Sequence, residues 1–153
     1  MLRIVPLAQM PSCANELREW FESEWPDYYG PGGPGNAAAD LSTFAQTDRL
    51  PLALVALRGD ELCGMAALKA EAFADLHPLS PWASAGLVKP ALRRSGIGAQ
   101  LLAALEVQAR SLGFARIYCA TSTANSLLRR NGWQLLRIVA KDGTEVAVFD
   151  KAI

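Results

Sequence analysis

Residues 88–98 read Val88-Lys89-Pro90-Ala91-Leu92-Arg93-Arg94-Ser95-Gly96-Ile97-Gly98, a basic, glycine-containing segment past the middle of the chain. The apolar run Ala83–Val88 before it has strand length, and Pro90 ends the run because proline has no N–H for a sheet hydrogen bond. After it, apolar residues recur at helical spacing, and a glycine follows where a helix would stop: Ile97, Leu101, Leu105, Leu112 and then Gly113. The pattern predicts a strand, a basic turn and then a helix.

The turn has the chemistry of an anion site. The first amides of a helix lack intrahelical partners and lie at the positive end of its dipole. Gly96 and Gly98 have no Cβ, so the oxygens of an anion can approach the backbone closely. Ser95 offers a hydroxyl donor, and Arg93 and Arg94 add positive charge. The turn therefore predicts a phosphate or pyrophosphate cradle; the alternative is an ordinary helix start with two solvated arginines.

Two common nucleotide-binding loops do not match. A P-loop requires a lysine directly after its second glycine, and none follows these glycines. A dinucleotide-binding fingerprint requires a third glycine, but Leu101 occupies that position, and the unit lies in mid-chain rather than at the start of a βαβ unit.

The rest of the chain alternates between short apolar runs and helical patterns. Strands are expected at Leu2–Leu7, Leu52–Leu57, Leu62–Phe73, Ala83–Val88, Phe114–Ala120, Trp133–Ala140 and Glu145–Lys151, and helices at Pro11–Trp25, Ala39–Thr47, after residue 96, and from Thr121 or Ser122 to Arg130. Pro26–Asn36, rich in glycine and proline, is expected to contain neither helix nor central strand. With Tyr28 and Tyr29, it is either a mobile lid over a substrate or a plain surface loop. This order is typical of an α+β fold in a single domain, residues 1–153.

Composition narrows the possible partners. The formal charge is zero, with 15 basic and 15 acidic residues, so a nucleic-acid partner is not expected, although the half with the cradle is locally basic. Three scattered cysteines argue against a disulfide framework, and a single histidine gives no credible zinc site. There is no signal-peptide core and no apolar stretch of about 20 residues, so we expect a cytoplasmic protein without membrane contact. Monomer and homodimer both remain open.

The spacing V-x-P-x-x-R-R-x-G-x-G at residues 88–98 resembles the acyl-CoA signature of the GNAT superfamily of N-acyltransferases. Residues 121–133 resemble that family's second motif, N-x-x-A-x-x-L-Y-x-x-x-G-F. The resemblance implies a mixed, mostly antiparallel seven-stranded sheet with about four helices and splayed central strands. It also implies that pantetheine pairs with the strand at Leu87 and Val88, and that the pyrophosphate lies on the backbone of seven residues: Arg93, Arg94, Ser95, Gly96, Ile97, Gly98 and Ala99.

The second motif departs from the family at two functional positions. Thr121 replaces an asparagine, although its hydroxyl can still bond the cofactor or the chain. Leu128 stands where the family usually has the tyrosine that protonates the departing CoA thiolate. Because a thiol has a pKa of about 8.5, the CoA thiolate can leave without a general acid. Loss of the acid would then slow the reaction by roughly 10²–10⁴-fold without abolishing it. Tyr118 and Ser126 are possible replacement donors, and each is equally well explained as a structural residue.

The resemblance implies direct attack of a neutral amine on the thioester of acetyl-CoA. Deprotonating a lysine-like amine of pKa about 10.4 at pH 7 costs about 4.6 kcal/mol, against about 1.4 kcal/mol for an α-amine of pKa near 8. Candidate bases are His77, Asp75 and Glu71, with Glu22 and Glu24 as further possibilities, although a solvated charge explains each of them as well. Cys119 as an acyl-accepting nucleophile is weaker still, because strand cysteines are usually small core residues.

The sequence thus predicts an acetyl-CoA-dependent N-acetyltransferase acting on a primary amine of a small molecule or peptide. The rival from another functional class is a non-catalytic acyl-CoA-binding or sensing domain, which Leu128 favours. A nucleotide-binding protein is the third possibility.

Overall fold

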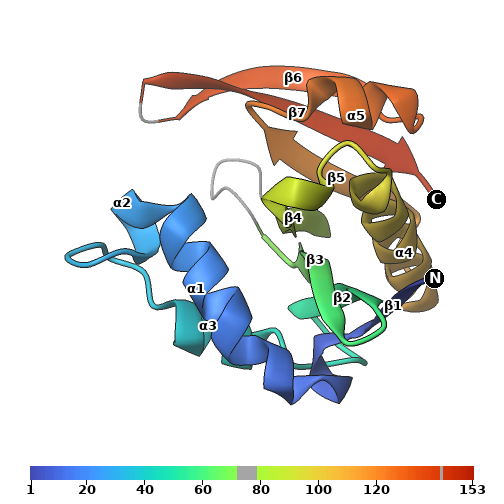
Figure 1. Cartoon of the computed structure of the whole chain (residues 1–153). Helices are drawn as coiled ribbons and strands as arrows, with labels where there is room; N and C mark the ends of the chain where they lie inside the picture. The colour runs from blue at the N-terminus through green and yellow to red at the C-terminus, as the bar shows by residue number, and fades with distance from the viewer. Residues whose placement is uncertain (72–78, 142) are drawn as a thin grey trace.

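The computed structural model describes residues 1–71, 79–141 and 143–153. A seven-stranded sheet runs through the molecule in the order β1-β2-β3-β4-β5-β7-β6 (Figure 1). Its strands are β1 (Leu2–Pro6), β2 (Leu52–Arg58), β3 (Glu61–Lys69), β4 (Trp82–Val88), β5 (Arg116–Thr121), β6 (Gln134–Lys141) and β7 (Thr144–Ala152). All neighbouring pairs are antiparallel except β4 and β5. The predicted α+β class and mixed sheet are therefore confirmed.

Helices cover both faces of the sheet. The described part contains α1 (Ala14–Glu24), α2 (Pro26–Tyr29), α3 (Ala37–Thr43), α4 (Ile97–Ser111) and α5 (Asn125–Arg130), with short 3₁₀ turns that include η4 (Pro90–Leu92). The helices α1 and α3 pack on one face through Leu17, Phe21 and Leu41, and α4 packs on the other through Leu101 and Leu105. Because both faces are covered, β2 and β3 are buried over almost their whole length.

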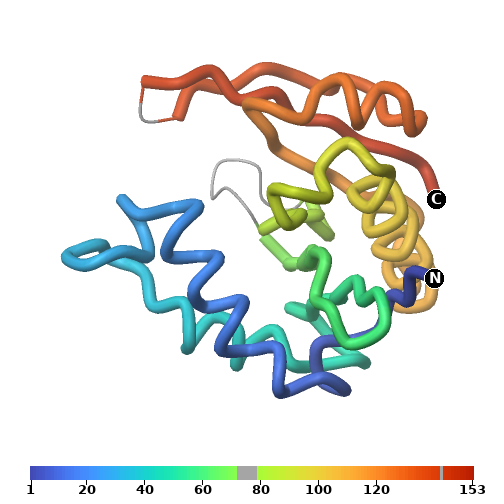
Figure 2. The backbone as a smooth tube through the Cα atoms, viewed as in Figure 1, coloured from blue at the N-terminus to red at the C-terminus, as the bar shows by residue number. Residues whose placement is uncertain are grey.

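The path of the chain separates two halves of the molecule (Figure 2). Residues before β4 form α1–α3 and one side of the sheet, whereas α4, α5 and the β6–β7 hairpin come from the later chain. No helix in residues 1–71, 79–141 or 143–153 is long and apolar enough to cross a bilayer.

Several predicted boundaries move, and one prediction is wrong. The segment after α1 was expected to hold no helix, yet α2 forms one turn from Pro26, because proline is tolerated at the first helical position. The helix expected at Ala39–Thr47 begins earlier, at Ala37, where the Asn36 side chain accepts the Ala39 amide at 3.0 Å. The strand expected at Leu62–Phe73 ends at Lys69.

The two central strands diverge. β4 and β5 are paired only at Trp82↔Tyr118 and Ala83↔Cys119, so the sheet opens beyond these residues. On its other side, β4 has one more residue than β3 between the pairs Met65↔Leu87 and Ala67↔Ser84, which is a β-bulge. Ala85 lies in this bulge with φ +53°, a backbone region that non-glycine residues rarely adopt. The bulge bends β4 where it leaves β5, which confirms the expected splay.

A glycine in β3 allows α4 to lie close to the sheet. A Cβ at Gly64 would lie 2.9 Å from the Leu87 carbonyl oxygen and 3.1 Å from Leu101 Cδ1. Glycine at this position therefore lets β3, β4 and α4 approach one another closely.

Candidate active site

An inner cavity of about 370 Å³ occupies the gap between the diverging strands. Its walls are β4 (residues 83–88), residues 119–124 of β5 and the following loop, one side of α4 and α5, and Trp25 with Met65. Met65 belongs to the core cluster under α1 and α3, whereas Leu101 and Leu128 belong to the cluster under α4. The inner cavity therefore crosses the sheet, with the α4–α5 side at one end and the α1 side, at Trp25, at the other.

An outer cavity of about 1020 Å³ adjoins it on the α4–α5 side. The two share Val88, Gly98, Thr123, Ala124 and Leu127, so they are continuous at the start of α4. The remaining outer walls come from the turn before α4 and from α5, with the charged side chains Arg93, Arg94 and Arg130 and no acidic residue among the described lining residues. A larger, positively charged hollow thus leads into a smaller one without charged side chains among its described lining residues.

The turn at the junction has the backbone of an anion nest. Arg94 and Gly96 adopt left-handed conformations, with φ +65° and +89°, and Gly96 is the residue that caps α4. The first helical hydrogen bond is from the Gln100 amide to the Gly96 carbonyl oxygen at 3.1 Å. Within the described chain, the amides of residues 94–99 therefore have no hydrogen-bond partner and are available to an anion.

Gly98 is positioned for close approach. It lines both cavities, and a Cβ there would meet Leu127 Cδ2 at 3.4 Å, so any larger side chain would enter the junction. An anionic head group on the free amides with an uncharged arm in the inner cavity fits this arrangement, and a CoA thioester has both parts. The residues present therefore fit acyl-CoA as a co-substrate.

The structure places the remaining cofactor candidates as follows. Leu87 and Val88 line the inner cavity, and Ile97 and Ala99 line the outer one. Ser95 donates its hydroxyl to the Leu92 carbonyl oxygen and lines neither cavity, so in this conformation it is not the anion donor that was expected.

Thr121 and Leu128 both line the inner cavity, in different ways. Thr121 Oγ1 accepts the Thr123 and Ala124 amides at 3.1 and 2.8 Å, so its hydroxyl bonds the chain and fastens the loop before α5. That loop delays the helix, which begins at Asn125 rather than at the predicted Thr121 or Ser122. Leu128 is 1% exposed and packs in the core under α4, so an apolar side chain closes this wall.

The replacement acids are not brought to the inner cavity. Tyr118 lies on the face of β5 opposite Cys119 and packs against Trp82, with ring centroids 5.5 Å apart. Tyr118 lines neither cavity, and Ser126 lines only the outer one.

The described candidate bases do not line the inner cavity, and two further candidates fall outside the described residues. His77 and Asp75 fall in residues 72–78, outside the described residues. Glu71 is exposed beyond the end of β3 and lines neither cavity. Glu22 pairs with Arg18 at 3.0 Å and Glu24 pairs with Arg93 at 3.3 Å, so both carboxylates are held in ion pairs.

Cys119 lines the inner cavity, and its thiol is un-ionised. Burial raises the pKa of Cys119 to about 12, because the low-dielectric surroundings disfavour the thiolate. The nucleophilic thiolate is therefore strongly disfavoured at neutral pH. This supports the interpretation of Cys119 as a small wall residue.

Sequence reasoning missed three groups that shape the site. Trp25 was expected as the last residue of the first helix, and the tertiary structure places it on the inner cavity. Arg130 is the second of two consecutive arginines within residues 121–133, and this basic pair was a signal for a positively charged surface, which the structure places on the outer cavity. Gly86 in an apolar strand was a signal for the bulge in β4.

The wall formed by α5 is fastened to the body of the domain. Lys151 Nζ of β7 lies 3.0 Å from Glu106 Oε1 of α4 and donates to the Asn131 carbonyl oxygen at 2.8 Å. Asn131 in turn donates its side-chain amide to the Leu127 carbonyl oxygen at 2.7 Å. These bonds hold α5 beside α4 and so fix the width of the junction.

Tyr29 holds the Tyr28–Tyr29 segment against α1 and α3. Tyr29 donates to Asp40 Oδ2 at 2.7 Å and packs on Phe21 at 5.2 Å, and its pKa is raised by burial and by this carboxylate. Tyr28 is 50% exposed. Neither Tyr28 nor Tyr29 is among the described residues that line the two cavities.

Comparison with known proteins agrees with this geometry. A profile of the acetyltransferase (GNAT) family matches residues 14–131. An aminoglycoside 6'-N-acetyltransferase solved with coenzyme A superposes with a TM-score of 0.79 at 14% identity, covering 98% of this chain and 96% of that one. The corresponding enzyme from Enterococcus faecium gives 0.78 at 16% identity with 98% and 96% coverage.

A GNAT acetyltransferase from Streptococcus pneumoniae gives a TM-score of 0.72 at 18% identity, with both chains fully covered. At these identities the structural likeness shows the fold alone. Comparison with curated protein sequences gives no significant match. Because the family profile covers more than half of the chain, the protein belongs to the acetyltransferase (GNAT) family.

Proposed function

We propose that this chain, acting as one domain, transfers an acetyl group from acetyl-CoA to a primary amine of a small molecule or peptide. The observation that carries the proposal is the inner cavity, which crosses the sheet between β4 and β5 and opens onto an anion nest. The two reactants can therefore reach one point from opposite faces. Direct attack of the amine on the thioester requires no covalent enzyme intermediate, and the un-ionised Cys119 fits that requirement.

Each part of the site has a proposed task. The free amides of residues 94–99 hold the diphosphate along the backbone of Arg93 to Ala99, with Arg93 and Arg94 supplying charge. Leu87 and Val88 lie along the pantetheine arm, and the bulge beside them leaves β4 with one residue more than β3 in the ladder. The acetyl group comes from the co-substrate, and the chain positions it in the inner cavity.

No described side chain of the inner cavity is identified as the base that takes the proton of the acceptor amine. Among the described residues that line the inner cavity, Cys119 is the one titratable side chain, and it stays protonated. An amine with a low pKa needs less help, so we propose a weakly basic acceptor in preference to a lysine-like one. His77, Asp75 and Glu71 remain proposals for the base.

The rival function, a non-catalytic acyl-CoA-binding domain, is favoured by one specific observation: Leu128 closes the wall where the family's acid usually stands, and Tyr118 does not reach the cavity. Acetyl-CoA turnover with a panel of amines, followed by release of free thiol, separates the two functions. Thiol release that depends on an amine supports the enzyme. CoA binding without release for any amine supports the binding domain, and absence of CoA binding rejects both.

We also propose a reducing, cytoplasmic location. Cys13, Cys63 and Cys119 are free thiols in the structure, which suits a reducing compartment.

A further inference from the structure

One ion pair joins the two sides of the site. Arg93 Nη2 lies 3.3 Å from Glu24 Oε2, although the two residues are 69 positions apart in the chain. Arg93 also donates from Nε to the Val88 carbonyl oxygen at 2.9 Å, so its guanidinium is anchored at the end of β4. Arg93 lines the outer cavity, and Glu24 is the last residue of α1.

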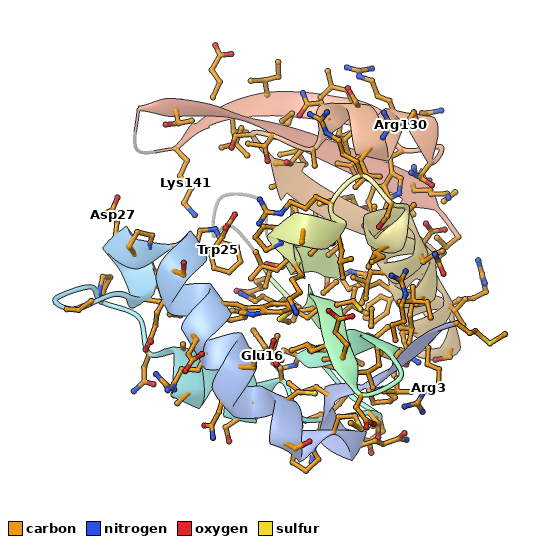
Figure 3. All side chains as sticks on the ribbon, in the orientation of Figure 1. Arg3, Glu16, Trp25, Asp27, Arg130 and Lys141 are labelled. Carbon is orange, nitrogen blue, oxygen red and sulfur yellow. The ribbon has the colours of Figure 1, made fainter. Side chains whose placement is uncertain are left out.

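The residue after Glu24 forms the far wall of the inner cavity. Trp25 lines that cavity, and its amide donates to the Phe21 carbonyl oxygen at 3.0 Å to close the last turn of α1. Figure 3 shows Trp25 at the end of α1, facing the centre of the molecule, with Lys141 projecting toward the same region from the β6–β7 hairpin. The Arg93–Glu24 pair therefore tethers the acceptor-side wall to the proposed diphosphate turn.

This ion pair is weak enough for Arg93 to exchange Glu24 for another anionic partner. The Arg93 and Glu24 side chains are 46% and 41% exposed, and an exposed pair of this kind contributes at most about fivefold to an equilibrium. A diphosphate on the same turn brings more negative charge and fork-shaped acceptor groups that suit a guanidinium better than one exposed carboxylate does. The diphosphate and Glu24 therefore compete for one cation.

We propose that Glu24 is a positioning residue that couples the two substrate sites through Arg93. Without acyl-CoA, Glu24 holds Arg93 and fixes the end of α1 beside Trp25. Binding of the diphosphate draws Arg93 away from Glu24 and releases that end of the helix, which frees the acceptor side after the co-substrate has bound. By linkage, breaking the pair strengthens acyl-CoA binding by the free energy that the pair contributes. The inference rests on the proposed acyl-CoA site.

The test compares Glu24→Gln with Glu22→Gln. The control breaks the Arg18–Glu22 pair, which lies on the same helix with similar exposure, 38% and 41%, and touches neither cavity. Calorimetric titration with CoA should give a dissociation constant about two- to fivefold lower for Glu24→Gln and unchanged for Glu22→Gln. In an Arg93→Gln background the effect of Glu24→Gln should vanish.

Hydrogen exchange supplies a readout that a purely structural role would not move. Adding CoA to the wild type should speed amide exchange in residues 21–25, whereas Glu24→Gln should show the faster exchange with and without CoA. Equal or weaker CoA binding by Glu24→Gln, or exchange that does not respond to CoA, overturns the coupling while leaving the acyl-CoA site intact. A wild type that binds no CoA removes both the coupling and the proposed function.

Discussion

Gly98 gives the most direct test of the acyl-CoA site. It is the second residue of α4, has ordinary helical backbone, and lines both cavities where they join. A Cβ there would meet Leu127 Cδ2 at 3.4 Å, an ordinary contact, so Gly98→Ala should fold and gain slightly in helix stability. Gly96 is less suitable because its φ of +89° makes any substitution strained.

The expected loss follows from the hydrogen bonds at stake. A methyl group at Gly98 separates the ligand from one amide, and a charge-assisted hydrogen bond contributes about 1.5–3 kcal/mol, or roughly 10- to 150-fold in affinity. Gly98→Val adds three carbons at the junction and should abolish measurable binding. Calorimetric titration with CoA measures the affinity, and thermal unfolding shows whether each variant is folded.

Gln100→Ala is the matched control. Gln100 is exposed on the same helix turn and lines neither cavity, so CoA affinity should not change. A folded Gly98→Val protein that binds CoA as tightly as the wild type would refute the assignment of the nest to the diphosphate.

Four further outcomes are expected. Arg130→Gln should weaken binding of CoA more than that of CoA lacking its 3'-phosphate, because Arg130 is a cation on the outer cavity; equal weakening in parallel titrations contradicts this role. Gly64→Ala should lower the free energy of unfolding by about 1–3 kcal/mol in urea, since its Cβ would lie 2.9 Å from the Leu87 oxygen. Leu128→Tyr should lower the free energy of unfolding by a similar amount, because Leu128 is 1% exposed and a larger side chain does not fit there. An unchanged midpoint of urea unfolding would contradict this expectation. Iodoacetamide should label Cys119 far more slowly than a free thiol at pH 8, since burial raises its pKa to about 12 and the reactive thiolate forms only as pH approaches that value; rapid labelling, read by mass spectrometry, contradicts it.

Local patterns predicted much of this molecule. The strand, turn and helix around Gly96 were readable because proline, glycine and apolar spacing each act over a few residues. The α2 turn was missed because the Gly/Pro-rich composition of the segment outweighed the fact that Pro26 can begin a helix. The Ser95 hydroxyl was expected to face an anion, but it bonds the Leu92 carbonyl oxygen within the turn.

Contacts between distant segments could not be predicted in this way. The periodicity of α1 marks Trp25 as apolar, but apolar residues line cavities as well as cores, and only the divergence of β4 from β5 creates the cavity. The Arg93–Glu24 pair joins segments that share no local pattern. Leu128 was readable as a departure from the family's tyrosine, whereas its full burial was not.

A zero net charge conceals a division that matches the two ends of the inner cavity. Residues 1–87, which include α1–α3 and the first strands of the sheet, hold eleven of the fifteen acidic side chains and five of the fifteen basic ones, whereas residues 88–153 hold four and ten. The outer cavity is lined by three cations of the later part, Arg93, Arg94 and Arg130, whereas α1, which ends beside Trp25, carries four glutamates. An anionic co-substrate and a protonated amine are therefore each attracted to opposite faces of one sheet. The Arg93–Glu24 pair joins the basic part of the chain to the acidic part. In the proposed coupling, one arginine therefore binds the diphosphate of the co-substrate and also affects the Trp25 wall on the acceptor side.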